Sequence, residues 1–200
     1  MKLVIASGNP GKLREIKEML ADLTINVLSL KDYPQIGEIP ETGSSFRENA
    51  ALKAETVAKI TGEWVLADDS GLEVDALGGR PGIYSARFAG EGAGDAANNA
   101  KLLQELKAIG GHNRKARFRA IIAIAHPGRE TLFAEGECEG YITDKPQGSG
   151  GFGYDPLFYY PPAGLTFAQM TAEEKNKVSH RAKALAKAYN ILKEISFREK

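Results

Sequence analysis

The chain has 200 residues, of which 42% are hydrophobic, and its 26 Lys and Arg residues balance 26 Asp and Glu residues. This length fits one domain, or one domain with a second lobe, and the apolar fraction supports a core. The zero net charge argues against broad binding to nucleic acid or to a membrane surface. The single cysteine, Cys138, excludes an internal disulfide and favours a reducing compartment. Because the N-terminal apolar run is too short for a signal peptide, the expected location is the cytoplasm.

The chain opens with a predicted strand at residues 3–6 and a predicted helix at residues 13–20. Free backbone N–H groups and the positive end of a helix favour an anion between them, and a lysine adds charge. The spacing excludes a Walker A loop, because Asn9 and Pro10 alone separate the two glycines. An ordinary strand–turn–helix connection with an exposed lysine explains the pattern equally well. The six residues of this turn are Ser7, Gly8, Asn9, Pro10, Gly11 and Lys12.

A second strand is expected at residues 25–30, and a loop rich in Pro and Gly follows over residues 31–43. The next helix is predicted at residues 45–60, with Ser44 or Ser45 as N-cap and Glu48 in capping-box position to Ser45. Lys53 lies on the apolar stripe of this helix, where it needs an anionic partner or a route to water. It is therefore either a lysine reaching solvent or a phosphate contact. Glu41, at the end of the loop, is either a metal ligand or a solvated loop residue.

The sharpest acidic signal is the pair Asp68 and Asp69, which follows the predicted strand at residues 64–68. The chain is expected to turn at Gly71 before another strand at residues 72–77. Adjacent carboxylates repel each other, so the pair is costly unless a cation or a donor offsets it. Mg²⁺ suits such oxygen ligands, and one aspartate could also deprotonate a water. An Asx-type turn at a strand end is the structural alternative, although the doubled aspartate favours a functional site.

The second half of the chain mixes strands and helices, which indicates an α/β or α+β class with antiparallel pairing in the middle. The helical pattern near the C-terminus is expected to break or bend close to Ser179. The predicted elements are a glycine turn at residues 78–82, a helix at 95–109, a hairpin of strands at 116–125 and 131–142, a glycine-rich loop at 143–156, a short strand at 157–160 and helical pattern over 171–195.

Residues 148–153 match the G-x-G-x-x-G pattern, but an aromatic strand follows them in place of a helix, which excludes a dinucleotide fold. Phe152 and Tyr154 in this loop could hold a flat base by stacking, or the loop could be a mobile surface segment.

A capping box at residues 171–174 places Lys175 in the opening turns of a helix. His180 and Arg181 are expected in the first turn of the next helical segment, where positive charge opposes the helix dipole. Recognition of an anion or a base explains this arrangement better than stability does, since Arg181 can donate to a phosphate or a carbonyl. A solvated basic face is the alternative.

Together these segments resemble one family, the inosine/xanthosine triphosphate pyrophosphatases, also called noncanonical purine NTP pyrophosphatases. The resemblance implies an α/β fold with an elongated mixed β-sheet flanked by helices, a single domain over residues 1–200 with two lobes around a central substrate cleft, and a homodimer. It also implies Mg²⁺-dependent hydrolysis of ITP, dITP and XTP to the nucleoside monophosphate and pyrophosphate, which cleanses the nucleotide pool. The matching segments occur in family order at residues 7–12, 41–54, 66–72, 77–87, 151–156 and 179–181.

By the same resemblance, Asp69 would be the general base that activates water and, with Glu41, a metal ligand, although the sequence leaves open whether Glu41 or Glu48 reaches the metal. Lys53 would help residues 7–12 to hold the triphosphate, and Ser70 would contact the nucleotide. Donors on His180 and Arg181 in the base pocket would select a purine with oxygen at position 6. The residues of the base and ribose pocket would be Phe152, Gly153, Tyr154, Asp155, Lys175, His180 and Arg181.

Two alternatives to this function stay open. One is a pyrophosphatase for pyrimidine or other nucleoside triphosphates, or a phosphatase that releases orthophosphate. The other is a regulator that binds a nucleotide without hydrolysing it, although a pure binder gains nothing from two carboxylates beside a phosphate without a metal.

Overall fold

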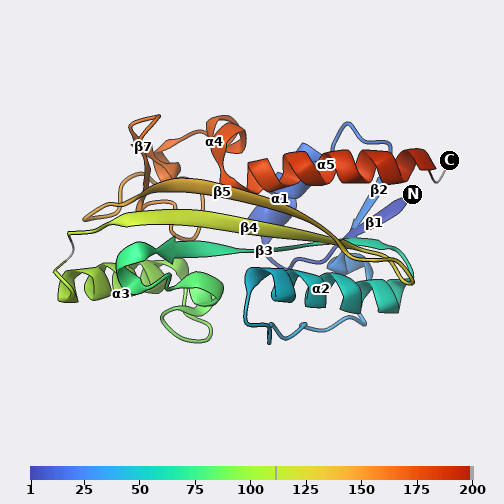
Figure 1. Ribbon diagram of the computed structural model, residues 1–200, viewed down its shortest axis with the longest axis horizontal. Coiled ribbons are helices and arrows are strands. Elements are labelled where there is room, and N and C mark those ends of the chain that lie inside the picture. Colours follow the sequence, from blue (N-terminus) through green and yellow to red (C-terminus); the bar gives the residue numbers. More distant parts are fainter. Residues whose placement is uncertain (111, 199–200) are drawn as a thin grey trace. The chain divides into compact units, whose positions relative to one another are not determined.

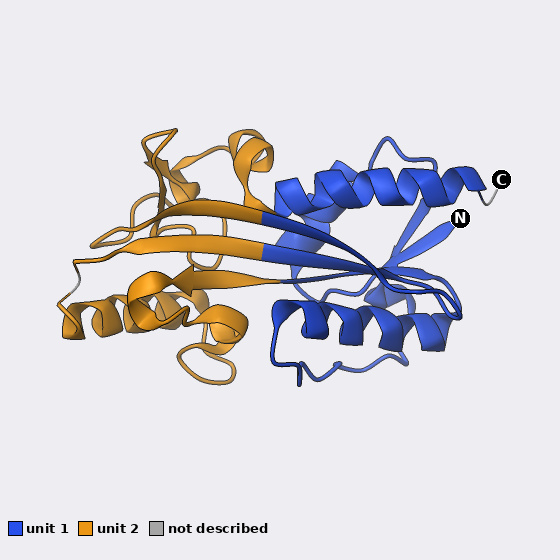
Figure 2. Cartoon of the chain, in the orientation of Figure 1, with its two compact units in different colours: residues 1–69, 120–136, 181–200 blue, residues 70–119, 137–180 orange. Residues whose placement is uncertain are grey.

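The computed structural model describes residues 1–110 and 112–198. The chain divides into two compact units, shown in separate colours in Figure 2. Unit 1 comprises residues 1–69, 120–136 and 181–200, and unit 2 comprises residues 70–119 and 137–180. None of the described helices is long and apolar enough to cross a membrane.

The described strands form one seven-stranded sheet in the order β2-β1-β3-β4-β5-β6-β7 (Figure 1). Strand β1 pairs in parallel with both β2 and β3, whereas β6 pairs antiparallel with both β5 and β7. The sheet is therefore mixed, which confirms the predicted fold class. The strands are β1 (Lys2–Ile5), β2 (Asn26–Ser29), β3 (Trp64–Val74), β4 (Lys115–Ala125), β5 (Leu132–Ile142), β6 (Phe158–Tyr160) and β7 (Leu165–Thr166).

In unit 1, helices α1 (Pro10–Met19) and α5 (His180–Arg198) lie on one face of the sheet, and α2 (Phe46–Thr61) lies on the other (Figure 1). Side chains of a strand alternate between the two faces. Leu3, Ile5 and Leu66 accordingly pack in one cluster with residues of α1 and α5. Their strand neighbours Val4 and Val65 are also fully buried. The strands of this unit are thus covered on both faces, which is typical of parallel strands in α/β proteins.

In unit 2, helix α3 (Asp95–Ala108) and the short helix α4 (Ala172–Val178) accompany the remaining parts of β3, β4 and β5. The core of this unit is aromatic, and Phe118, Phe158 and Phe167 form mutual ring contacts in it. Leu102 and Leu106 of α3 belong to the same cluster, so the apolar side of α3 faces this core as its periodicity predicts. Short 3₁₀ helices lie at residues 75–77, 82–87 and 167–169.

The prediction of a turn at Gly71 is wrong. Strand β3 continues through Ser70 and Gly71 to Val74, so the two predicted strands are one. Nearly all its residues are buried, and Leu72 N–H donates to Ser85 Oγ at 2.9 Å. Asp-Ser-Gly resembles a turn locally, but burial on both sides keeps the backbone extended. The two aspartates therefore lie inside a strand rather than at its end.

The predicted break near Ser179 is confirmed. Helix α4 ends at Val178, α5 begins at His180, and the residue between them has extended backbone angles. The capping box that opens α4 is also confirmed, because Thr171 Oγ1 accepts from Glu174 N–H and the Glu174 carboxylate accepts from Thr171 N–H.

Candidate active site

Strand β3 presents Asp68 and Asp69 as a buried pair, exposed by only 1% and 6%. The Asp68 carboxylate contacts Lys12 of α1, with Oδ2 2.7 Å from Nζ. The Asp69 carboxylate contacts Lys53 of α2, with Oδ1 3.3 Å from Nζ. Because α1 and α2 lie on opposite faces of the sheet, the alternation of the strand separates the two charges. Each aspartate therefore has its own cationic partner, Lys12 for Asp68 and Lys53 for Asp69.

Lys53 joins Asp69 to the loop that precedes α2. Its Nζ lies 2.6 Å from Glu41 Oε1 and donates to the backbone carbonyl of Asp68 at 3.0 Å. This inward-facing lysine was expected to have an anionic partner or a route to water, and the structure provides anionic partners. A single ammonium group brings the two predicted metal ligands to one place.

The two aspartates have opposite electrostatic characters. Burial raises the pKa of Asp69, and the attraction of Lys53 and Lys12 only partly offsets this effect. Burial acts in the same sense on Asp68, but Lys12 and Arg181 outweigh it and hold the pKa of Asp68 far below its usual value. Burial would also lower the pKa of Lys53, yet Asp69 and Glu41 outweigh it and the pKa is raised. Asp68 is therefore a fixed anion, whereas Asp69 is the carboxylate with the greater proton affinity.

The structure places Glu41 and Glu48 in different surroundings. The Glu48 carboxylate accepts from the backbone N–H and the hydroxyl of Ser44, at 2.7 and 2.8 Å. The expected capping box with Ser45 forms only in part, since Ser45 Oγ accepts from Glu48 N–H while the carboxylate caps Ser44. Glu48 is thus used in the helix start, and Glu41 is the glutamate that approaches Asp69.

The expectation of free N–H groups at the start of α1 is wrong for Gly11 and Lys12. Both donate to Asn9 Oδ1, at 2.9 and 3.2 Å, and Pro10 has no N–H to offer. Asparagine is among the best N-cap residues, so it satisfies the helix end itself. Ser7 Oγ in turn accepts from Asn9 N–H at 3.2 Å. The positive charge that this turn presents is consequently the ammonium group of Lys12, which pairs with Asp68.

Arg181 lies in unit 1, beside Asp68 of β3. It is 2% exposed, it donates to Glu15 of α1, and its Nε lies 3.5 Å from Asp68 Oδ2. Glu15, Arg181, Asp68 and Lys12 form a buried chain of alternating charge. The sequence analysis did not identify Glu15. A signal for it exists, because Glu15 precedes Ile16 on the buried side of α1.

In unit 2, the structure brings together three of the predicted pocket residues. Lys175 Nζ lies 2.7 Å from Asp155 Oδ2 and 4.6 Å from the centre of the Phe152 ring. The same carboxylate oxygen accepts from Phe152 N–H at 2.9 Å. A side chain on Gly151 would meet this carboxylate at 2.0 Å, so only glycine fits there. Asp155 thus holds both the backbone of this loop, at Phe152, and the ammonium group of Lys175.

His180 is 4% exposed and stacks on Phe118, with ring centroids 4.6 Å apart and planes inclined by 11°. This aromatic contact fixes the imidazole plane in unit 2. Ser70 follows Asp69 directly on β3 and is partly buried.

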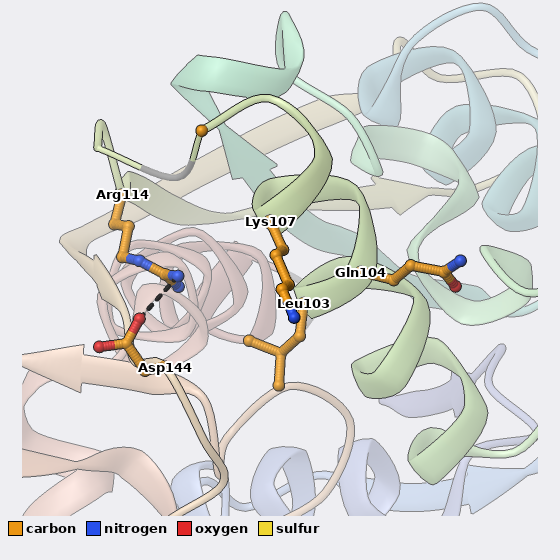
Figure 3. A pocket seen from close by; sticks show the side chains of 6 residues that line it. Leu103, Gln104, Lys107, Arg114 and Asp144 are labelled. Atoms are coloured by element: carbon orange, nitrogen blue, oxygen red, sulfur yellow. Dashed lines mark ion pairs between the residues drawn. The ribbon is translucent and has the colours of Figure 1, made fainter.

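A pocket of about 570 Å³ lies elsewhere in unit 2, at the C-terminal end of α3 (Figure 3). Arg114 in its wall lies 2.7 Å from Asp144 and donates to the carbonyl of Thr143 at 3.1 Å. These contacts engage the guanidinium group of Arg114. The pocket contains none of the predicted site residues and is lined by Leu103, Gln104, Lys107, Gly110, Arg114 and Asp144.

A buried carboxylate pair with separate lysines, carried by a mixed sheet, defines an α/β protein suited to chemistry on a phosphate substrate. The sequence profile of the Ham1 family matches residues 3–191, and the chain belongs to this family.

Relatives of known name support this assignment. The dITP/XTP pyrophosphatase of Shouchella clausii is 55% identical over 92% of each chain. The enzyme of the same name from Geobacillus kaustophilus is 53% identical over 93% of this chain and 91% of its own. The solved structure of the Staphylococcus aureus Ham1 protein is 43% identical, has a TM-score of 0.88 and covers 97% of this chain and 99% of its own. The family predicted from the motifs is confirmed.

Proposed function

We propose that this protein is a nucleoside triphosphate pyrophosphatase that hydrolyses dITP, ITP and XTP to the monophosphate and pyrophosphate. The relatives named dITP/XTP pyrophosphatase support the reaction and its purine substrates. The observation that carries the proposal is the contact of Lys53 Nζ with both Glu41 and Asp69, at 2.6 and 3.3 Å. A cation between two carboxylates, beside a second lysine, is an arrangement suited to a metal-bound polyphosphate.

The residues of this site fit Mg²⁺. Glu41 and Asp69 provide the hard oxygen ligands that Mg²⁺ prefers. Asp69 Oδ2 is buried and has no hydrogen-bond partner among the described residues, so it retains an acceptor for a cation. In the described part of the chain, no group of three or more acidic, His or Cys side chains is arranged so that it could hold a metal ion. Mg²⁺ usually keeps several waters and substrate oxygens, and two carboxylates are enough for such a site. When bound, Mg²⁺ would neutralise charge on the triphosphate.

In the proposed mechanism, Asp69 accepts a proton from the water that attacks the α-phosphate in line. The raised pKa of Asp69, caused mainly by burial, suits a general base better than that of a fully solvated aspartate. Lys12 and Lys53 balance the charge that develops on the departing pyrophosphate. Asp68 orients Lys12 through the 2.7 Å ion pair and remains ionised throughout.

The residues predicted for the base and ribose pocket keep this role in the proposal. Phe152 is partly buried and offers aromatic surface, and Asp155 and Lys175 fix the loop that carries it. The predicted stacking of Tyr154 is not supported, because this side chain is 4% exposed and packs in the core of unit 2. His180 and Arg181 remain the proposed donors toward the oxygen at purine position 6. Adenine carries an amino group there, which would leave a buried donor without a partner and lower the rate.

A panel of nucleoside triphosphates with Mg²⁺ tests the proposal, with pyrophosphate and orthophosphate measured separately. We expect pyrophosphate from dITP, ITP and XTP, and little product from dATP or dCTP. Orthophosphate as the sole product would identify a phosphatase, and binding without any product would identify a regulator. Either result would overturn the proposed reaction.

We further propose that the protein is a homodimer and acts in the cytoplasm. The location rests on the single cysteine, Cys138, which suits a reducing compartment. Sedimentation equilibrium of the purified chain tests the dimer, and a monomer mass at micromolar concentration would contradict it.

A further inference from the structure

Two side chains of helix α3 hold Gly153, in the loop of residues 152–155, by its backbone N–H and carbonyl groups. Asp95 Oδ2 accepts a hydrogen bond from Gly153 N–H at 2.6 Å. Asn99 Nδ2 donates one to the Gly153 carbonyl at 2.8 Å. Asp95 and Asn99 are four residues apart, so they lie on the same side of the first turns of α3. We call these two contacts the Gly153 clamp.

The Gly153 clamp acts on the residue of this loop whose backbone has the most conformational freedom. Gly153 has a φ of +62°, in the left-handed region, and glycine has more conformational freedom to lose than any other residue. Its neighbours are fixed by other groups: Phe152 N–H donates to Asp155, and Tyr154 Oη donates to the Ser85 carbonyl at 2.8 Å. The Gly153 peptide is the link between these two aromatic residues, and α3 sets its orientation.

The hydrogen-bond pattern of Asn99 shows that its orientation follows from Gly153. Asn99 is 8% exposed, and its Oδ1 is buried without a partner among the described residues. Leaving a buried acceptor unsatisfied costs free energy. The donating amide is thus kept toward the Gly153 carbonyl even though the other end of the side chain gains no hydrogen bond.

We propose that Asp95 and Asn99 are positioning residues for base selection, which act by holding the Phe152–Asp155 loop through Gly153. This inference rests on the proposed function of that loop. Neither residue is required to touch the nucleotide. Loss of the clamp should therefore relax discrimination between bases and leave the handling of the triphosphate unchanged.

Two pairs of variants separate the clamp from a general effect on the helix. Asp95→Asn removes the charge that favours the helix N-terminus but keeps an acceptor oxygen, whereas Asp95→Ala removes both. Asn99→Asp keeps the shape but places a carboxylate against the Gly153 carbonyl, and Asn99→Ala removes the donor. Gln104→Ala, at an exposed position of α3, is the control.

The measurement is the ratio of kcat/KM for dITP to that for dATP, with inhibition by inorganic pyrophosphate and the thermal midpoint measured in parallel. We expect Asp95→Ala and Asn99→Asp to lower the ratio about tenfold. Asp95→Asn should stay close to the wild-type ratio, and pyrophosphate inhibition should not change in any variant. The control should match the wild type throughout.

An unchanged ratio in folded Asp95→Ala and Asn99→Ala proteins would overturn the inference, as would equal losses in Asp95→Asn and Asp95→Ala. Because Asp95 is exposed, its variants are expected to fold even where a substitution of buried Asn99 does not.

Phe152→Ala distinguishes a failure of the clamp inference from a failure of the proposed base site. If Phe152→Ala lowers the ratio and the clamp variants do not, only the clamp is wrong. If Phe152→Ala also leaves it unchanged, the base site itself is wrongly assigned.

Discussion

Asp68 and Asp69 are adjacent in β3, yet each is paired with a lysine from a different face of the sheet. Lys12 Nζ lies 2.7 Å from Asp68, and Lys53 Nζ lies 3.3 Å from Asp69. Their pKa values move in opposite directions, because two cations outweigh burial at Asp68 and burial prevails at Asp69. Chemically identical substitutions at the two positions should therefore have different consequences.

Asp68→Asn should lower the free energy of unfolding by about 3 kcal/mol, because Lys12 and Arg181 lose a buried anion. Asp69→Asn should leave the free energy of unfolding unchanged or raised, bind dITP, and lower kcat by about 10²–10⁴-fold. Urea unfolding, calorimetric binding and kcat measurements check these outcomes. Near-normal turnover by Asp69→Asn would remove Asp69 as the general base.

Glu41→Gln and Glu48→Gln form a matched pair for the proposed Mg²⁺ site. Mutation of a residue in the outer shell of a metal site typically lowers metal affinity by about 10–100-fold. Loss of a direct ligand should therefore lower the affinity at least as much. Glu41→Gln should raise the Mg²⁺ concentration for half-maximal activity accordingly and weaken Mn²⁺ binding measured by electron paramagnetic resonance.

Glu48→Gln should instead weaken the start of α2, since its carboxylate caps Ser44. The expected loss is about 1 kcal/mol of unfolding free energy, with unchanged Mg²⁺ dependence. If the two variants exchanged these phenotypes, Glu48 would be the ligand and the assignment of Glu41 would be wrong.

Arg181→Ala should both destabilise the protein and narrow the preference for dITP over dATP. Glu15 and Asp68 would be left as buried anions without their shared cation, which costs about 3–5 kcal/mol. The ratio of kcat/KM values should fall if Arg181 also contacts the base, as the motif predicts. Lys187→Ala, also on α5 but exposed, should change neither quantity. Loss of stability with an unchanged ratio would confine Arg181 to the charge network.

The order of the elements could be predicted because each carries a local signal. The break between α4 and α5 follows from a capping box at Thr171 and from the serine before His180. The helix of Lys53 follows from apolar spacing, and that spacing also showed that the lysine faces inward. Periodicity and caps are properties of neighbouring residues, so a single sequence contains them.

The partners of the charged residues could not be predicted in the same way. Glu15 and Arg181 are 166 positions apart, and nothing in either segment specifies the other. Strand β3 illustrates the same limit. The sequence Ser70-Gly71 is typical of a turn, but in the fold this segment is part of a strand in which nearly all residues are buried. Likewise, a glycine turn before a helix favours free N–H groups, whereas those of Gly11 and Lys12 donate to the side chain of Asn9. Tertiary context decides each of these cases.

Tyr154 provides a test of burial in unit 2 through the pH dependence of stability. Burial, with a smaller contribution from Asp95, raises the pKa of Tyr154 above its ordinary value of 10.0. Above this pH the unfolded chain loses the phenolic proton while the folded chain keeps it. Unfolding is then favoured, so the free energy of unfolding falls as pH rises.

Tyr154→Phe should remove this dependence. At pH 7 the variant should be less stable by about 1 kcal/mol, because the hydrogen bond to the Ser85 carbonyl is lost. Between pH 10 and pH 11 the wild type should lose about 1 kcal/mol more than the variant, so the difference should vanish. Urea unfolding at several pH values measures it, with Tyr141→Phe at an exposed position as control. A constant difference across this range would show that Tyr154 ionises as readily in the folded chain as in the unfolded one.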